Sequence, residues 1–396
     1  MKKVLFLAAA LLAGGVLRAQ EALREGSDFS PEIHADNTVT FRLWAPKAVR
    51  VQLAGDFLPA QKLATPQGEV DGPRIAELTE GAGGIWSYTT PEPLASELYQ
   101  YAFVVDGLRM TDPANVHQVR DVATISNIFI IGGGQGDLYR VNEVPHGTVS
   151  RIWYESPTLG MQRRMSVYTP AGYETGRERY PVLYLLHGMG GDEEAWLALG
   201  RTAQLLDNLI ARGLAKPMIV VMPNGNAALE AAPGEGANGL VAPKFQLPKT
   251  MEGSYETAFP DVVRYIDAHY RTIRSKHGRA IAGLSMGGFH ALHISKSYPD
   301  WFDYVGLFSA AIVPVEGADS PIYADNEAKL GAQFARKPAL YWIAIGRDDF
   351  LYEANRSYRQ WLDGQGYPYQ YRESEEGHIW KNWRLYLSEF VPMLFR

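Results

Sequence analysis

The chain of 396 residues contains no cysteine. It therefore has no disulfide, no thiol nucleophile, no thiolate metal ligand and no N-terminal cysteine that could carry a lipid. It also lacks a basic surplus, since 38 Lys and Arg stand against 44 Asp and Glu and the formal net charge is −6. A nucleic-acid partner is not expected, because proteins that bind phosphate backbones usually carry an excess of positive charge.

Long apolar runs are also scarce. The first twenty residues contain one, from Val4 to Leu12, which follows Lys2 and Lys3 and precedes a plausible cleavage point at Ala19-Gln20. The run is too short to span a bilayer, and its position predicts a bacterial signal peptide whose cut site is left open. A buried N-terminal helix is the alternative. We expect a secreted or periplasmic protein that is not held in a membrane.

Residues 28–132 are predicted to form an all-β, immunoglobulin-like sandwich. Short segments alternate between apolar and polar residues and are separated by turn residues, a pattern typical of such sandwiches. The segments with this alternation are Thr38–Trp44, Val49–Leu53, Gly84–Thr90 and Leu98–Val105. The glycine-rich stretch that begins at Gly132 predicts a linker over residues 133–143.

Residues 144–396 show a different pattern, in which apolar runs alternate with helix-like segments. This alternation predicts βαβ units and a mostly parallel sheet, with functional residues at the carboxyl ends of the strands. The expected strands are Tyr180–Leu186, Pro217–Met222, Ala280–Ala282, Tyr304–Phe308 and Leu340–Ile345. The expected helices are Thr202–Arg212, Phe259–Tyr270, Gly288–Tyr298 and Tyr352–Leu362. Residues 226–254 have little periodicity and are interpreted as part of an active-site rim or, alternatively, as a disordered surface excursion.

A nucleophile motif follows one of these strands. Gly283-Leu-Ser-Met-Gly287 fits G-x-S-x-G between a strand and a helix, which is the context of the nucleophile in an α/β-hydrolase. The two glycines would remove side chains that collide with the neighbouring strand and helix, and the helix N-terminus would favour an oxyanion. The motif predicts Ser285 as the nucleophile; the alternative is a glycine-rich turn with an idle serine.

The general base is selected by elimination, because the triad of this fold runs serine, acid, histidine along the chain. Only three histidines follow Ser285, and His290 and His293 lie on the helix that leads away from it. His378 lies between the last strand and the last helix, where the base is expected to take the serine proton. Asp348 and Asp349 both follow the strand Leu340–Ile345 and both qualify as the acid.

The oxyanion hole needs two backbone donors. One is expected to be the N–H of Met286, directly after the nucleophile. The other is expected from the loop His187-Gly-Met-Gly-Gly191, through Gly188 or Met189. His187 is interpreted as a support for this loop, since the triad already has a base.

Four segments together resemble the esterase D-like group, which includes feruloyl and acetylxylan esterases of carbohydrate esterase family one and enterochelin esterases. These segments are Pro181–Gly191, Ala280–Gly288, Gly346–Leu351 and Glu376–Trp380. The resemblance covers nearly all of residues 145–396 and implies Asp349 as the acid, because it occupies the last position of the group's G-x-x-D motif. The group often has Gly-Gly before the histidine, where this chain has Glu376-Gly377.

The N-terminal segment is similar to an early-set, family-48-like carbohydrate-binding module. The similarity rests on Phe41–Pro46, Gly84–Ser87, Tyr99–Gly107 and Asp112–Asn115. A module of this kind before an esterase resembles bacterial feruloyl esterases that act on arabinoxylan. A related β-domain also precedes enterochelin esterases, so the layout does not separate the two.

Four tryptophans are candidates for contacting the substrate, because aromatic faces stack on sugars and on feruloyl rings. Trp196 and Trp380 lie near the predicted site, as does Trp383, and Trp86 is the candidate for an exposed sugar platform in the N-terminal domain. Core packing is the alternative for each of them, and Trp44 is expected in the core.

The resemblance implies a serine esterase that releases hydroxycinnamates from arabinoxylan through an acyl-enzyme, without a metal or other cofactor. The expected partner is a plant cell-wall polysaccharide, feruloylated or acetylated xylan, as the substrate. Deacetylation of xylan, hydrolysis of a siderophore ester, and a carbohydrate-binding protein with an inactive hydrolase domain are the alternatives. A catecholate siderophore is anionic and should favour a basic pocket. The pair Arg163 and Arg164 and the basic cluster at 271–279 are interpreted as solvated surface.

Overall fold

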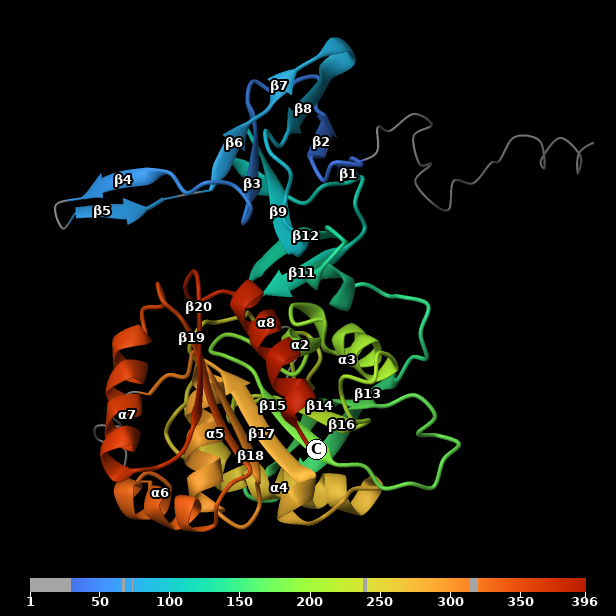
Figure 1. Cartoon of the computed structure of the whole chain (residues 1–396). Helices are drawn as coiled ribbons and strands as arrows, with labels where there is room; N and C mark the ends of the chain where they lie inside the picture. Colours follow the sequence, from blue (N-terminus) through green and yellow to red (C-terminus); the bar gives the residue numbers. More distant parts are fainter. Residues whose placement is uncertain (1–29, 66–67, 73, 238–240, 313–319) are drawn as a thin grey trace, which may run out of the picture. The chain divides into compact units, whose positions relative to one another are not determined.

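The computed structural model describes residues 30–65, 68–72, 74–237, 241–312 and 320–396 (Figure 1). The predicted signal peptide, residues 1–20, lies outside the described residues. The chain forms two units: residues 1–94 with 102–116, and residues 95–101 with 117–396. Strand β9 (Leu98–Val105) is shared between them, because the division falls after Tyr101.

The first unit consists of short antiparallel strands. One sheet has the order β1-β2-β8-β7, and a second contains β3, β6, β10 and the end of β9. The bounds are β1 (Glu32–Ile33), β2 (Val39–Trp44), β3 (Val51–Gly55), β4 (Lys62–Thr65), β5 (Gly68–Asp71), β6 (Ile75–Glu77), β7 (Thr79–Glu80), β8 (Ile85–Thr89) and β10 (Leu108–Met110). Every second residue of β2 is buried, at Val39, Phe41 and Leu43, so the period-2 pattern forms the inner face. The predicted β-domain is confirmed.

Two tryptophan predictions for this unit are wrong, and the strand register explains both. Trp86 pairs with Leu43 and therefore points to the inner face, where it is 8% exposed and its Nε1 donates to the Ala45 carbonyl. Trp44 follows the buried Leu43, so it points outward and is 53% exposed. Trp86 is thus a core residue instead of a sugar platform, and Trp44 is a surface residue instead of a core residue.

The second unit is built on one eight-stranded sheet of order β13-β14-β16-β15-β17-β18-β19-β20. Strand β14 pairs antiparallel with both of its neighbours, and the pairs from β16 to β20 are parallel. The bounds are β13 (Thr148–Ser156), β14 (Met161–Thr169), β15 (Val182–Leu186), β16 (Ile219–Pro223), β17 (Arg279–Leu284), β18 (Tyr304–Phe308), β19 (Leu340–Gly346) and β20 (Gln370–Ser374). The first two strands were not predicted, because Arg163 and Arg164 interrupt the apolar pattern of β14.

Helices cover both faces of this sheet (Figure 1). One face carries α2 (Ala195–Ala198), α3 (Thr202–Ala211) and α8 (Trp380–Phe390), and the other carries α4 (Ser254–His269), α5 (Met286–Ser297), α6 (Asn326–Ala335) and α7 (Tyr352–Gln365). Leu183 and Leu185 of β15 pack into the first core, whereas Val182, Tyr184 and Leu186 pack into the second. Burial on both faces explains the continuous apolar strands. The predicted α/β-hydrolase architecture is confirmed.

One β-hairpin belongs to the second unit, although the sequence analysis placed its residues in the sandwich. It consists of β11 (Gln118–Asp121) and β12 (Thr124–Ile130), and β12 pairs with the start of β9. Val119 and Ile128 of the hairpin pack in the same core as α2, α3 and α8. Arg384 of α8 donates to the carboxylate of Glu97 and to the carbonyl of Leu98, and both charged side chains are almost fully buried.

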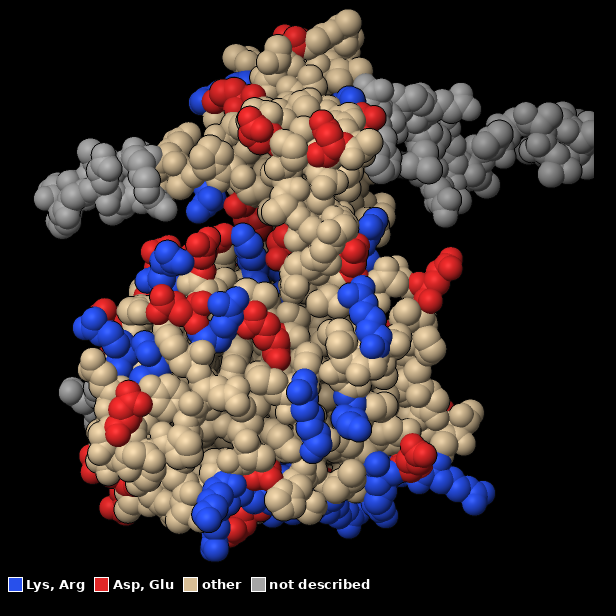
Figure 2. Space-filling model, in the orientation of Figure 1, with Lys and Arg blue, Asp and Glu red and all other residues tan. Residues whose placement is uncertain are grey.

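The stretch expected to be a linker contains a short 3-10 helix (Gln135–Leu138), and Tyr139 directly after it is fully buried. Over the part of the chain that the structure describes, no helix is both long and apolar enough to cross a bilayer. Figure 2 shows acidic and basic side chains interspersed over the face of the second unit that it presents.

Candidate active site

Ser285 lies on the tight turn between β17 and α5. Its backbone has φ 53° and ψ −115°, a conformation that costs a non-glycine residue about 1–3 kcal/mol. Its N–H donates to the Phe308 carbonyl at 2.9 Å, and its carbonyl accepts from the N–H of Ala311 at 3.0 Å. A Cβ added to Gly283 would lie 2.3 Å from the carbonyl carbon of Gly287. The strand and helix can therefore approach each other only because glycine stands there.

His378 and Asp349 form a hydrogen-bonded pair. The His378 Nδ1 lies 2.9 Å from Asp349 Oδ2, and the N–H of Leu351 donates to Asp349 Oδ1 at 2.9 Å. The Asp349 side chain is buried, whereas Asp348 is exposed. A carboxylate at Nδ1 favours the tautomer that leaves Nε2 free to take a proton. The structure thus brings Asp349, and not Asp348, to the histidine.

Two aromatic rings hold the His378 imidazole. The centroid of Phe350 lies 4.6 Å from the imidazole centroid, and that of Trp383 lies 4.9 Å away in an edge-to-face arrangement. Phe350 is 76% exposed, so it forms the outer wall, and Trp383 is buried. Packing against these two rings restricts the orientation of the imidazole.

The loop after β15 lies directly against the nucleophile. A Cβ added to Gly188 would lie 2.4 Å from Leu284 Cδ1 and 3.4 Å from the Ser285 Cβ. Gly188 and Met189 line the same cavity as Ser285, and α5 begins at Met286, whose N–H has no partner within the helix. The three residues predicted to supply the oxyanion hole therefore line the same cavity as the serine.

His187 is bonded through both of its ring nitrogens. The N–H of Gly225 donates to Nε2 at 2.7 Å, so Nε2 carries no proton and Nδ1–H donates to the Gly188 carbonyl at 2.8 Å. His187 is 2% exposed, and burial lowers its pKa to about 4. A neutral histidine with no free nitrogen holds the loop in place and is not available as a base.

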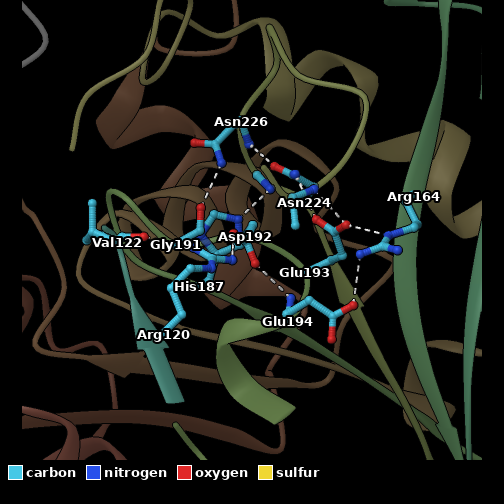
Figure 3. A network of polar contacts seen from close by, with 12 residues as sticks. Arg120, Val122, Arg164, His187, Gly191, Asp192, Glu193, Glu194, Asn224 and Asn226 are labelled. Atoms are coloured by element: carbon cyan, nitrogen blue, oxygen red, sulfur yellow. Dashed lines mark hydrogen bonds and ion pairs between the residues drawn. The ribbon is translucent and has the colours of Figure 1, made fainter. Parts of the chain in front are cut away.

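The same loop is anchored by the carboxylate of Glu193, which is fully buried. Glu193 accepts from Arg164 Nε at 2.7 Å, from Asn224 Nδ2 at 2.8 Å and from the N–H of Ala232 at 2.8 Å (Figure 3). A buried carboxylate is stable only when its oxygens are paired in this way. Glu193 therefore ties the loop to β14 and to the segment after β16.

On its other side the loop is tied to the β11–β12 hairpin. Arg120 donates through Nη2 to the buried Asp192 at 2.5 Å and through Nη1 to the Val122 carbonyl at 2.9 Å (Figure 3). Asn226 Nδ2 donates to the Gly191 carbonyl at 2.8 Å. The glycine-rich loop is thus fixed by three groups of polar contacts from three different segments.

The interpretation of Arg163 and Arg164 as solvated surface is wrong. Arg163 is 1% exposed and donates to the carbonyls of Asn224 and Asn226, and Arg164 is 5% exposed. Strand β14 lies between two others in the sheet and is covered on both faces, so these side chains lie inside despite their charge. Arg279 of the 271–279 cluster begins β17, at the opposite end of the strand from Ser285.

A cavity of about 1040 Å³ opens over the nucleophile. Ser285 and His378 lie on its wall together with apolar and aromatic side chains, namely Leu199, Phe245, Met251, Phe350, Trp380 and Trp383. Phe245 and Met251 come from residues 226–254, so that segment forms part of the rim. Trp380 lines the cavity as expected. The expectation for Trp196 is wrong: it is 1% exposed, and its Nε1 donates to the Leu186 carbonyl in the core.

Each arginine on the cavity wall is paired with a carboxylate. Arg120 pairs with Asp192 at 2.5 Å, and Arg151 pairs with Glu194 at 2.6 Å. Arg164 pairs with Glu194 and with Glu235. Within the described ranges, no cluster of three or more histidine or acidic side chains is arranged to hold a metal ion.

Sequence reasoning missed three residues on this wall that the hairpin supplies: Arg120, Asp121 and Val122. No local motif marks them, because they lie in a segment whose alternation matches that of the N-terminal strands. Phe350 was also missed, although its position directly after Asp349 was a usable signal.

The α/β-hydrolase class is defined by three features at one edge of a mostly parallel sheet, all of which are present here. They are a serine on a strand-to-helix turn, a histidine paired with an acid, and a glycine-rich loop. Within this class, the sequence model of the Esterase family matches residues 156–394. The chain therefore belongs to this family of carboxylic ester hydrolases. The model of carbohydrate-binding module 48, the isoamylase N-terminal domain, matches residues 26–116. Both resemblances inferred from the sequence are confirmed.

One relative is an endo-1,4-beta-xylanase/feruloyl esterase of Xylanibacter ruminicola, 30% identical over 295 residues. The alignment covers 74% of this chain but only 37% of that protein. Among solved structures, a CE1 ferulic acid esterase from Anaeromyces mucronatus is 27% identical with a TM-score of 0.53, covering 65% of this chain and 95% of that one. The enterobactin esterase of Shigella flexneri, at 18% identity and a TM-score of 0.58, covers 90% of this chain and 92% of that one, and shares the fold.

Proposed function

We propose that this protein is a feruloyl esterase that releases hydroxycinnamates from feruloylated arabinoxylan. Two relatives that are at least 27% identical carry feruloyl or ferulic acid esterase in their names. The observation that carries the proposal is the cavity of about 1040 Å³ over Ser285, with its aromatic and aliphatic wall. Such a cavity suits an acyl group with an aromatic ring.

The size of the acyl group separates this proposal from deacetylation of xylan. Burying roughly 150 Å² of a feruloyl ring would contribute about 4 kcal/mol, whereas the methyl of an acetyl group would contribute about 1 kcal/mol. An acetyl group would leave most of the apolar wall unused. The cavity therefore favours the aromatic acyl group.

The charges on the wall bear on the siderophore alternative. Its arginines are Arg120, Arg151 and Arg164, and its acidic residues are Asp121, Asp192, Glu194 and Glu235. Because each arginine is already paired with a carboxylate, the described wall offers no surplus positive charge to a catecholate with bound iron. A neutral ester is the better match.

In the proposed reaction His378 Nε2 takes the proton of Ser285 as its Oγ attacks the ester carbonyl. Asp349 holds the imidazole through Nδ1 and stabilises its charged form. The N–H of Met286 and that of Gly188 or Met189 stabilise the oxyanion. His378 then protonates the leaving sugar hydroxyl, and water, deprotonated by the same histidine, cleaves the acyl-enzyme to ferulate and free serine.

We also propose that the protein acts outside the cytoplasm and that its N-terminal unit contacts the polysaccharide. The first point is tested by the N-terminal sequence of the protein recovered from periplasm or medium. The second is tested by comparing binding of the full chain to insoluble xylan and to cellulose. A precursor retained intact in the cytoplasm, or equal retention on both polymers, would contradict these two points.

The test of the main proposal is steady-state hydrolysis of methyl ferulate, acetylated xylan and a catecholate siderophore ester by the same preparation. We expect kcat/KM for methyl ferulate to exceed the other two by a hundredfold or more, which is about 2.7 kcal/mol of discrimination in the transition state. A preference for the siderophore would overturn the substrate assignment and leave the nucleophile assignment intact.

A further inference from the structure

Asp121 is an acidic residue on the cavity wall that the proposed reaction does not use. It is the last residue of β11 and pairs with Thr124 across a tight turn in which Val122 has φ 52°. The neighbouring Arg120 directs its guanidinium to Asp192 and to the Val122 carbonyl. Trp380 lines the same cavity, and its indole N–H lowers the pKa of the Asp121 carboxyl.

The surroundings of this carboxylate are aromatic and aliphatic. The rings of Trp380 and Trp383 lie 5.2 Å apart and nearly perpendicular, and both residues are at least nine-tenths buried. Leu199 and Ala198, at the end of α2, line the same part of the cavity. Burial raises the pKa of the Asp121 carboxyl, whereas the Arg120 charge and the Trp380 N–H lower it. A carboxylate in such surroundings gains from each further donor.

The tryptophans also connect Asp121 to the catalytic histidine. The centroid of Trp383 lies 4.9 Å from that of His378 and 5.2 Å from that of Trp380, and Asp121 lines the same cavity as these three residues. The adjacent rings of His378, Trp383 and Trp380 thus lie on the wall of the cavity that Asp121 also lines. A hydroxycinnamoyl group is a flat ring joined to the ester carbonyl by two carbons, and it can lie along such a wall.

We propose that Asp121 is a specificity-determining residue that accepts the hydrogen bond of the phenolic hydroxyl of the bound hydroxycinnamate. This inference rests on the proposed function, since it names the part of the acyl group that the same cavity recognises. A site built to accept a hydrogen bond discriminates strongly against an analogue that cannot donate one, because the buried acceptor is then left unpaired. The esterase should therefore prefer acids with a free ring hydroxyl.

The experiment compares two esters with the same ring substitution pattern. Methyl ferulate has a free para-hydroxyl, and methyl 3,4-dimethoxycinnamate has a methoxy group there. For the unaltered protein we expect kcat/KM to be at least tenfold higher for methyl ferulate. In Asp121→Asn we expect this ratio to fall to about threefold or less, chiefly through methyl ferulate, because asparagine keeps the size of the side chain but carries no charge.

Asp300→Asn serves as the matched control, since Asp300 lies on the surface and pairs with Arg336. The ratio within each variant is independent of how much protein is folded. Asp121→Ser supplies a second variant, and binding of ferulate and 3,4-dimethoxycinnamate to Ser285→Ala, followed by tryptophan fluorescence, measures the same discrimination without turnover.

The outcomes separate the two claims. If the protein hydrolyses methyl ferulate but the ratio is the same in Asp121→Asn, Asp121→Ser and the unaltered protein, the role of Asp121 is refuted and the proposed function stands. If neither hydroxycinnamate is hydrolysed while acetylated xylan is, the proposed function fails and this inference fails with it.

Discussion

The substitution His187→Phe tests whether this histidine holds the oxyanion loop or moves protons. Phenylalanine keeps a ring of similar size in a site that is 2% exposed, but it has neither nitrogen. The buried N–H of Gly225 then has no acceptor, and the Gly188 carbonyl loses the donor at 2.8 Å while keeping the N–H of Gly191. The loop beside Ser285 is therefore loosened, and the triad remains intact.

The magnitude follows from these bonds. An unsatisfied buried N–H costs about 1–3 kcal/mol, and the lost bond to Gly188 contributes about 0.5–1.5 kcal/mol. We expect a loss of about 2–4 kcal/mol in the free energy of unfolding. Since one complete oxyanion donor is worth roughly 10²–10³ in kcat, a displaced loop should lower kcat by about tenfold to a hundredfold and change KM by less than about threefold.

The assay combines urea unfolding, in which the midpoint should fall at constant slope, with steady-state hydrolysis of methyl ferulate. His269→Phe is the control, because His269 is exposed and stacks on Tyr265, so we expect its midpoint to shift little. A loss of kcat beyond about 10⁴-fold in His187→Phe would identify this residue as a base and refute the reasoning.

Two further predictions concern the same loop. Arg120→Met should lower kcat about tenfold with little change in KM, because Asp192 is 2% exposed and loses its guanidinium partner. Arg336→Met, which removes an exposed ion pair, is the control. Equal effects of the two substitutions on kcat would contradict the account. Through His187, the unaltered protein should lose up to about 3 kcal/mol of stability as the pH falls from about 6.5 to about 4. The pKa of His187 is about 4 in the folded protein and has its ordinary value in the unfolded chain, so the unfolded chain binds the extra proton. Burial lowers the pKa of His293 to about 2, so its share of the loss remains in His187→Phe. The stability difference between the unaltered protein and His187→Phe should therefore shrink by up to about 3 kcal/mol over this pH range, as measured by urea unfolding at several pH values.

The positions of Ser285 and His378 in the fold are examples of what the sequence predicts well. Ser285 lies in a motif whose glycines and flanking strand and helix are all local, and His378 followed from chain order by elimination. The acid could not be predicted from the sequence pattern in this way, because Asp348 and Asp349 are adjacent. They differ only in which one the turn after β19 directs inward. Spacing alone could not separate them, and the family resemblance was needed.

The wrong predictions share a physical cause, which is that burial depends on the partner strand. Trp44 and Trp86 exchange the expected roles because the register places Trp86 opposite Leu43. Arg164 is buried because Glu193, on a loop distant in sequence, supplies a paired carboxylate. Asp121 and Arg120 reach the cavity through a hairpin whose sequence carries no sign of that destination. Long-range pairing of this kind leaves no periodic signal.

The most direct measurement is the turnover of methyl ferulate by Ser285→Ala beside the unaltered protein, with circular dichroism to verify that both are folded. The account predicts that kcat falls by on the order of 10⁴–10⁶-fold while the fold is kept, because Ser285 carries the one hydroxyl side chain among the described residues that line the cavity. A loss of tenfold or less would show that Ser285 is not the nucleophile and would contradict the central claim.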